Sequence, residues 1–212
     1  MQKINKRYLF WSAILFLSFA LWTALICLVD VKAVGPNDSS VGFSTLNVFF
    51  HKLTGVNMTF YNISDWGGLV PVAFCLGFAV LGLCQWIKCK NILKVDYSIL
   101  LLGGFYIIVI AAYILFEYVV INYRPILING YLEASYPSST TLLVLCVMPT
   151  AIMQFNRRIK NSVFKKVVSF SITAFIILMV ALRLLSGVHW LTDIIGGALV
   201  SASLVTLYRS LI

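Results

Sequence analysis

The chain has 212 residues, of which 61% are hydrophobic and only 11% are charged, and its net charge is +9. Ordinary soluble domains are about 45–50% apolar, so this composition excludes a soluble globular protein and indicates an integral membrane protein. Basic and aromatic residues do not combine into a patch suited to nucleic acid, and we expect the positive charge to mark membrane orientation instead.

Six apolar runs are long enough, or nearly so, to cross a bilayer as helices, because lipid offers the backbone no hydrogen-bond partners. We interpret the first run as an uncleaved anchor, since its apolar stretch is longer than the core of a signal peptide. The sequence therefore predicts an all-α fold, with one domain over residues 1–212 built as a bundle of six transmembrane helices. The six runs cover approximately 8–29, 67–87, 97–121, 138–155, 167–185 and 190–211.

Most basic residues fall on one side of this six-span arrangement. The positive-inside rule then places both termini in the cytoplasm. The short chain favours a bacterial plasma membrane, with some affinity of the basic side for anionic membrane lipids. The basic residues on this side are Lys3, Lys6, Arg7, Lys88, Lys90, Lys94, Arg157, Arg158, Lys160, Lys165, Lys166 and Arg209.

Three segments are expected on the outer face. The first, 32–66, is the only long polar loop, and FSTLNVFFHKL within it predicts a short amphipathic helix. The second, NYRPILINGYLEASYP, joins the third and fourth spans, and the third lies around SGVHW. This topology places Arg124, Arg183 and His189 at the same membrane face.

Two arginines on one face suggest a shared anion, because the planar guanidinium matches phosphate oxygens in a bidentate way. An arginine near lipid is costly, so each is a candidate functional residue. For Arg124 the alternative is a membrane anchor whose head group reaches the lipid head groups. Arg183 ends a strongly apolar run and is harder to explain in that way.

His189 and Asp193 are four residues apart, so they share one helical face if the last span starts near residue 188. Asp193 can then orient the imidazole and leave its other nitrogen free as a nucleophile or base. The alternative is a polar pair that caps a helix. At the start of the fourth span, Ser138, Ser139 and Thr140 are either ordinary caps or part of an anion site at a helix N-terminus.

These residues resemble the signatures of the type 2 phosphatidic acid phosphatase superfamily, which also includes vanadium haloperoxidases. Arg183, His189 and Asp193 match the spacing of its third signature, Arg-x5-His-x3-Asp. Arg124, which precedes a proline, resembles the end of the first signature. Ser138, which follows a proline, resembles the start of the second.

The resemblance covers about 117–197 and implies a lipid-phosphatase-like helical bundle and a mechanism. His189, oriented by Asp193, would attack phosphorus and form a phosphohistidine that water hydrolyses. Arg124 and Arg183 would hold the phosphate oxygens. No metal or cofactor is implied. The expected substrate is a lipid phosphate or diphosphate at the extracytoplasmic face, such as phosphatidic acid, phosphatidylglycerol phosphate or polyprenyl diphosphate.

The chain departs from the family pattern in the first and second signatures and at the residue before the third. Glu117 stands where the family has a phosphate-binding lysine, and Thr140 stands where it has the histidine that protonates the leaving group. Ser139 replaces a glycine, and Leu182 replaces a serine. The absence of a positioned acid typically costs about 10²–10⁴-fold in rate. We include Ser138 with Ser139, Thr140 and Glu117 among the candidate substrate-binding residues.

Three explanations of these departures remain open. In the first explanation, Glu117 is protonated in a dry site and serves as the acid, because burial raises a carboxyl pKa. Alternatively, the leaving group needs little protonation, as in a lipid diphosphate. Third, the protein has lost hydrolysis and is a non-catalytic lipid-phosphate-binding or accessory protein. His51 is either a replacement acid or an interfacial histidine. The oligomeric state is left open.

Overall fold

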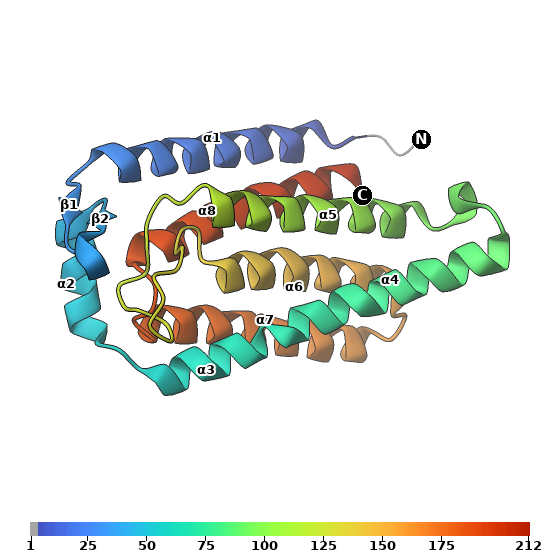
Figure 1. Cartoon of the computed structure of the whole chain (residues 1–212). Coiled ribbons are helices and arrows are strands. Elements are labelled where there is room, and N and C mark those ends of the chain that lie inside the picture. The colour runs from blue at the N-terminus through green and yellow to red at the C-terminus, as the bar shows by residue number, and fades with distance from the viewer. Residues whose placement is uncertain (1–3) are drawn as a thin grey trace.

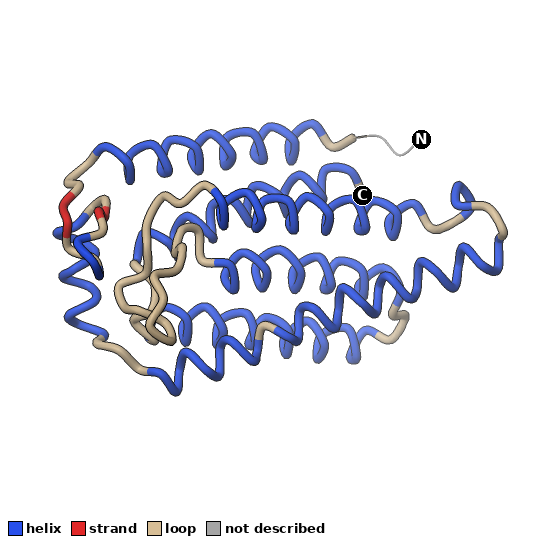
Figure 2. Tube along the Cα trace, in the orientation of Figure 1, coloured by secondary structure: helices blue, strands red, loops and turns tan. Residues whose placement is uncertain are grey.

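The computed structural model describes residues 4–212, so Lys3, which contributes to the predicted charge asymmetry, lies outside the described residues. Within that range the chain is almost entirely helical, with one two-stranded antiparallel pair and two short 3-10 helices (Figure 2). The elements are α1 (Lys6–Leu28), β1 (Lys32–Ala33), η1 (Pro36–Asp38), β2 (Ser40–Val41), α2 (Ser44–Thr54), α3 (Met58–Gly67), α4 (Leu69–Cys89), η2 (Ile92–Lys94), α5 (Tyr97–Tyr118), α6 (Ser139–Arg158), α7 (Ser162–Leu185) and α8 (Leu191–Leu211).

The structure confirms the six predicted spans. Six helical segments in the described chain are long and apolar enough to cross a membrane: α1, the combined α3–α4, α5, α6, α7 and α8. The second span begins earlier than the sequence predicted, because α3 and α4 run on from each other over Met58–Cys89. Its start is fixed by Asn57, whose side chain accepts a hydrogen bond from the amide of Phe60 at 3.0 Å.

The centre of the bundle is formed by α6 and α8, which pack against each other (Figure 1). More than half of the most apolar window of each is buried, whereas at most 28% of the corresponding window is buried in each of the other four spans. These two spans also have the lowest mean hydropathy of the six, as expected for helices that face protein instead of lipid. The hydroxyls of Ser12 and Ser203 each donate to the other residue's carbonyl, at 2.9 and 3.0 Å, and join α1 to α8.

The connections that carry the candidate site gather at one end of the bundle. Figure 1 shows α2, the β1–β2 pair, the α5–α6 loop and the α7–α8 turn at this end, and the chain termini at the other. The amphipathic helix predicted in the outer loop is confirmed as α2, Ser44–Thr54. The predicted outer segments therefore lie together, as the six-span topology requires.

The α5–α6 loop contains a hairpin that the sequence reading missed. Isolated antiparallel bridges join Tyr123 to Ala134 and Ile128 to Tyr131. Asn129 and Gly130 make the turn between them with positive φ values of 49° and 82°, which is the backbone that a tight Asn-Gly hairpin turn requires. The hairpin fixes which residues of the loop face each other.

Candidate active site

A polar cavity of about 270 Å³ opens at the end of the bundle where these loops meet. Its walls come from the end of α5, the hairpin loop, the first turns of α6 and the α7–α8 turn. The lining residues are Tyr113, Phe116, Glu117, Arg124, Glu133, Ala134, Ser135, Tyr136, Pro137, Ser139, Leu142 and His189.

His189 lies in the turn before α8, two residues from the first helical residue, so it is not on the helix itself as expected. The turn lies close to Gly55, the residue that follows α2: a Cβ at Gly187 would lie 1.9 Å from the Gly55 carbonyl oxygen. Gly187 also has a φ of +67°. His189 is only 4% exposed, and its Nε2 has no hydrogen-bond partner among the described residues. That free nitrogen belongs to a residue that lines the polar cavity.

The other imidazole nitrogen is held by Ser135. Nδ1 of His189 lies 3.1 Å from the carbonyl oxygen of Ser135 and 3.0 Å from its Oγ. A carbonyl oxygen only accepts, so Nδ1 carries the proton and Nε2 keeps its lone pair. The expected direct hydrogen bond from His189 to Asp193 is wrong: Nδ1 and Oδ2 are 3.7 Å apart, and the Ser135 hydroxyl donates to Oδ2 between them.

Asp193 is fully buried in the first turn of α8, where a carboxylate is favoured by the free amides of a helix start. Its Oδ2 accepts a hydrogen bond from the Trp190 amide at 2.9 Å, and its Oδ1 accepts one from Asn122 Nδ2 at 3.4 Å. With the Ser135 hydroxyl, three donors fix this carboxylate. Asp193 therefore acts on His189 through Ser135.

The neighbourhood of His189 keeps its imidazole neutral. Burial lowers the pKa of His189 well below its ordinary value of 6.5, and the positive charges of Arg183 and Arg124 lower it further. A neutral imidazole with a free Nε2 is the form that a nucleophile needs.

Arg124 enters the cavity from the hairpin. Its backbone amide donates to the carbonyl of Glu133 at 3.1 Å, and its Nη2 lies 3.2 Å from Glu133 Oε2. The residue is 8% exposed, and its Nε and Nη1 are buried without hydrogen-bond partners in the described chain. A buried guanidinium with free donors is costly unless a ligand satisfies them.

Arg183 lies next to the cavity but does not line it. It lies in the last turn of α7, is 1% exposed, and its Nη1 lies 3.4 Å from Ser64 Oγ and 3.6 Å from Asp65 Oδ1 of α3. Its Nε is buried and unpartnered among residues 4–212. Both arginines flank one ring: the guanidinium carbons of Arg183 and Arg124 lie 4.9 and 5.9 Å from the Tyr61 centroid.

The structure separates the four predicted substrate-binding residues. Ser139 lines the polar cavity, whereas Thr140 lines a neighbouring apolar cavity. Ser138 is fully buried and lines neither cavity. Its amide donates to the Asp193 carbonyl at 3.2 Å, and its Oγ accepts a hydrogen bond from the Thr141 hydroxyl at 3.0 Å. The proposed phosphate contact from the Ser138 side chain is therefore not supported.

Glu117 lines the polar cavity from the end of α5 but is exposed. The protein therefore does not bury Glu117 in the way that its role as a protonated acid required. His51 lies outside the lining of the polar cavity; its ring packs 5.6 Å from the ring of Trp190. The structure gives no support to His51 as a replacement acid.

Sequence reasoning missed Ser135 and Glu133 on the hairpin, and Tyr61 and Asp65 on α3. The Asn-Gly pair in the sequence was a signal for the hairpin turn, and the hairpin places Glu133 opposite Arg124. For α3 there was no comparable local signal, because its approach to Arg183 depends on how α3 packs against α7.

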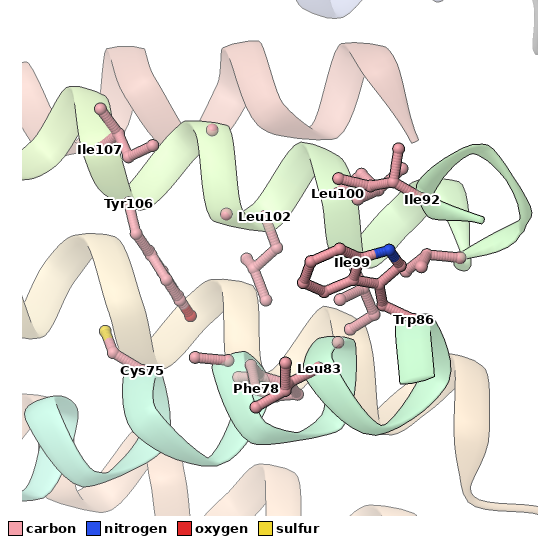
Figure 3. Close-up of a pocket in the computed structure, with 15 residues that line it drawn as sticks. Cys75, Phe78, Leu83, Trp86, Ile92, Ile99, Leu100, Leu102, Tyr106 and Ile107 are labelled. Atoms are coloured by element: carbon pink, nitrogen blue, oxygen red, sulfur yellow. The ribbon is translucent and has the colours of Figure 1, made fainter. Parts of the chain in front are cut away.

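Several further cavities in the described part of the chain are mainly apolar. One, of about 280 Å³, adjoins the site and shares Tyr113, Ser139 and Leu142 with it. Another, of about 420 Å³, lies between α4 and α5; Cys75, Phe78, Trp86, Leu102 and Tyr106 line it (Figure 3). Within residues 4–212, no group of three or more His, Cys, Asp or Glu side chains is arranged to hold a metal ion.

Comparisons with known proteins agree with this fold. A search of curated proteins gave no significant match. Among solved structures, the chain is similar to the crystal structure of the first transmembrane PAP2 type phosphatidylglycerolphosphate phosphatase from Bacillus subtilis. The TM-score is 0.65 at 18% sequence identity, over 93% of this chain and 94% of that one. The family model of the PAP2 superfamily matches residues 39–212. This match extends over most of the protein, including the hairpin and the α7–α8 turn, and the chain therefore belongs to the PAP2 superfamily.

Proposed function

We propose that this protein is a membrane phosphatase that hydrolyses a lipid phosphate or lipid diphosphate through a phosphohistidine intermediate. One observation carries the proposal: the unpartnered Nε2 of His189 and the unpartnered guanidinium nitrogens of Arg124 belong to residues of one polar cavity. Phosphoryl transfer without a metal requires at least a nucleophile and an anion-binding group in the same cavity.

In the proposed reaction, the phosphate oxygens bind to Arg124, Arg183 contributes its positive charge from behind the cavity lining, and Nε2 of His189 attacks phosphorus. The N–P bond forms as the P–O bond to the leaving group breaks. The leaving oxygen takes a proton from water, or departs as a phosphate when the substrate is a diphosphate. Water then attacks phosphorus, breaks the N–P bond and releases inorganic phosphate. The positive charge of the imidazole in the intermediate is supported by Ser135 and Asp193 on the Nδ1 side.

The apolar cavity beside the site supports an amphiphilic substrate. It shares Tyr113, Ser139 and Leu142 with the polar cavity, and its other lining residues are Val109, Ile110 and Leu143 of α5 and α6 together with Asp65, Gly68 and Thr140. A head group in the polar cavity would thus lie beside a surface that accepts a hydrocarbon chain. A soluble phosphate ester would leave that surface uncovered.

The charge distribution supports an extracytoplasmic site. The loops of the site lie at the end of the bundle opposite the chain termini (Figure 1), and Lys88, Lys90 and Lys94 lie around the α4–α5 connection at the terminal end. By the positive-inside rule that end faces the cytoplasm. We infer a bacterial plasma membrane, with both termini inside and the cavity outside. The bacterial source of the similar structure supports this choice.

A second candidate function is lipid-phosphate binding without hydrolysis. It is favoured by the position of Thr140, which replaces the family's acid and lines the apolar cavity instead of the polar one. The two candidates share a cavity and differ only in turnover. A single assay therefore separates them.

The experiment measures phosphate release in detergent from phosphatidic acid, phosphatidylglycerol phosphate and polyprenyl diphosphate. The wild type is compared with His189→Ala and with His51→Ala, which removes the other histidine outside the cavity. We expect release by the wild type and His51→Ala alone. Acid-labile, alkali-stable label on wild-type protein from a radioactive substrate would identify the intermediate. Lipid binding without release from any substrate would establish the binding protein instead.

A further inference from the structure

The charged lining of the polar cavity is more acidic than a phosphate site would require. Glu117 and Glu133 line it together with only one cation, Arg124, and Glu133 already contacts that cation at 3.2 Å. Behind the lining, Arg183 shares its charge with Asp65 at 3.6 Å. A phosphate monoester brings about two further negative charges at neutral pH. The cavity would therefore hold a bare lipid phosphate against repulsion from two carboxylates.

The acidic residues do not define the site by themselves. A ligand is indicated by the buried, unpartnered Nε2 of His189 and the buried, unpartnered nitrogens of Arg124, which belong to the same cavity. These groups fix where an anionic centre would lie. Glu117, Tyr113 and Phe116 form a different wall, at the end of α5, and would meet a different part of the same ligand.

The α5 wall has the chemistry of a cation-binding surface. Tyr113 and Glu117 are four residues apart, so their side chains share one face at the end of α5, and the ring of Phe116 packs beside them against Phe19 and Tyr136. A carboxylate next to aromatic rings attracts an ammonium group, by charge and by the negative faces of the rings. Glu117 forms no ion pair among the described residues, so its carboxylate is available.

Building on the proposed function, we propose that this cavity selects lipid phosphates that carry an ammonium group close to the phosphate. Glu117 is the specificity-determining residue: it binds the ammonium while Arg124 and His189 engage the phosphate. Such a ligand brings its own positive charge into the cavity and offsets the surplus of carboxylates. The replacement of the family's lysine by Glu117 then follows from the head group that the protein accepts.

The test uses a matched pair of substrates. One is a long-chain lipid phosphate with a primary amine on the carbon next to the phosphorylated carbon, and the other is its N-acetyl derivative, which lacks the charge. For the wild type we expect kcat/KM to be about two- to fivefold higher for the amine, the size expected for an ion pair with an exposed carboxylate. Glu117→Gln should remove the preference, and Glu117→Lys should reverse it by accelerating hydrolysis of the N-acetyl compound.

Asp38→Asn is the matched control, because it removes an exposed carboxylate at the same end of the bundle but outside the cavity lining. It should keep the full preference. Equal rates for the two substrates in the wild type, or a preference that survives Glu117→Gln, would overturn the inference. Absence of release from both would overturn the proposed function instead. In that case, thermal stabilisation of His189→Ala by each lipid still reports whether the amine binds more tightly.

Discussion

Oγ of Ser135 lies 3.0 Å from Nδ1 of His189, and the same hydroxyl donates to the carboxylate of Asp193. The serine thus replaces direct contact between the histidine and the aspartate. Its carbonyl also accepts from Nδ1, so one residue fixes both the tautomer and the orientation of the imidazole. Ser135 is a positioning residue, since it acts on the reaction through His189.

Substitution of Ser135 should lower turnover without weakening substrate binding. In Ser135→Ala the backbone carbonyl still fixes the tautomer, but the hydroxyl that links Nδ1 to Asp193 is lost. We expect kcat to fall about tenfold with KM unchanged, in line with one buried hydrogen bond worth roughly 1.4 kcal/mol. Ser135→Thr keeps the hydroxyl and should recover most of the rate. Equal losses in the two variants, or a change confined to KM, would contradict the positioning role.

If Arg124 binds the substrate phosphate as proposed, its ion pair with Glu133 must compete with that contact. Because Glu133 is partly exposed, with 39% of its side chain accessible, its ion pair with Arg124 is worth little. Glu133→Gln should therefore strengthen inhibition by inorganic phosphate or vanadate by about two- to fivefold, and no more. Inhibition constants for wild type and variant give the comparison. Weaker inhibition in Glu133→Gln would show that Glu133 supports the position of Arg124 instead.

Much of the fold follows from the sequence because lipid imposes a simple rule on each span. Every buried backbone group in the bilayer must be satisfied within the segment, so the apolar runs become helices with little dependence on their neighbours. The exception is the start of the second span, where the polar α3 continues into α4 and carries Asp65 to Arg183. A hydropathy window excludes such a polar extension.

The site was less predictable than the spans. Arg124 and His189 were correctly placed at one face, since the order of spans alone determines that. The interposition of Ser135 depends on the register of the hairpin, which in turn depends on the turn at Asn129 and Gly130. The helical periodicity that linked His189 to Asp193 was a poor guide, because the helix starts only at residue 191.

An unfolded histidine takes up its proton between about pH 7.5 and pH 6, whereas burial lowers the pKa of both His189 and His51 below the ordinary value of 6.5 and shifts their protonation to lower pH. His189 therefore stays neutral as the pH falls through this window. The unfolded chain takes up protons there and the folded chain does not, so stability should decrease as the pH falls below about 6.5.

Nuclear magnetic resonance of histidine-labelled protein in micelles would follow both rings, with His51→Asn to assign the signals. An imidazole assigned to His189 that titrates with a midpoint near 6.5 would contradict the buried, arginine-flanked environment. The same measurement on Arg124→Gln tests the cause. Removal of one positive neighbour should raise the His189 pKa toward its ordinary value, although burial remains the larger effect.

Gly187 should be essential for the position of His189, because two constraints act on it together. Its φ of +67° disfavours any residue with a Cβ, and an added Cβ would lie 1.9 Å from the Gly55 carbonyl oxygen, which is backbone and cannot move freely. Gly187→Ala should push the α7–α8 turn away from α2 and lower kcat by at least about tenfold, with a loss of stability of roughly 1–3 kcal/mol. Gly77→Ala is the control, since a Cβ at this α4 position meets nothing within 4 Å. Unfolding in detergent and steady-state rates should be measured on both variants. If Gly187→Ala keeps wild-type turnover, the α7–α8 turn does not position the nucleophile.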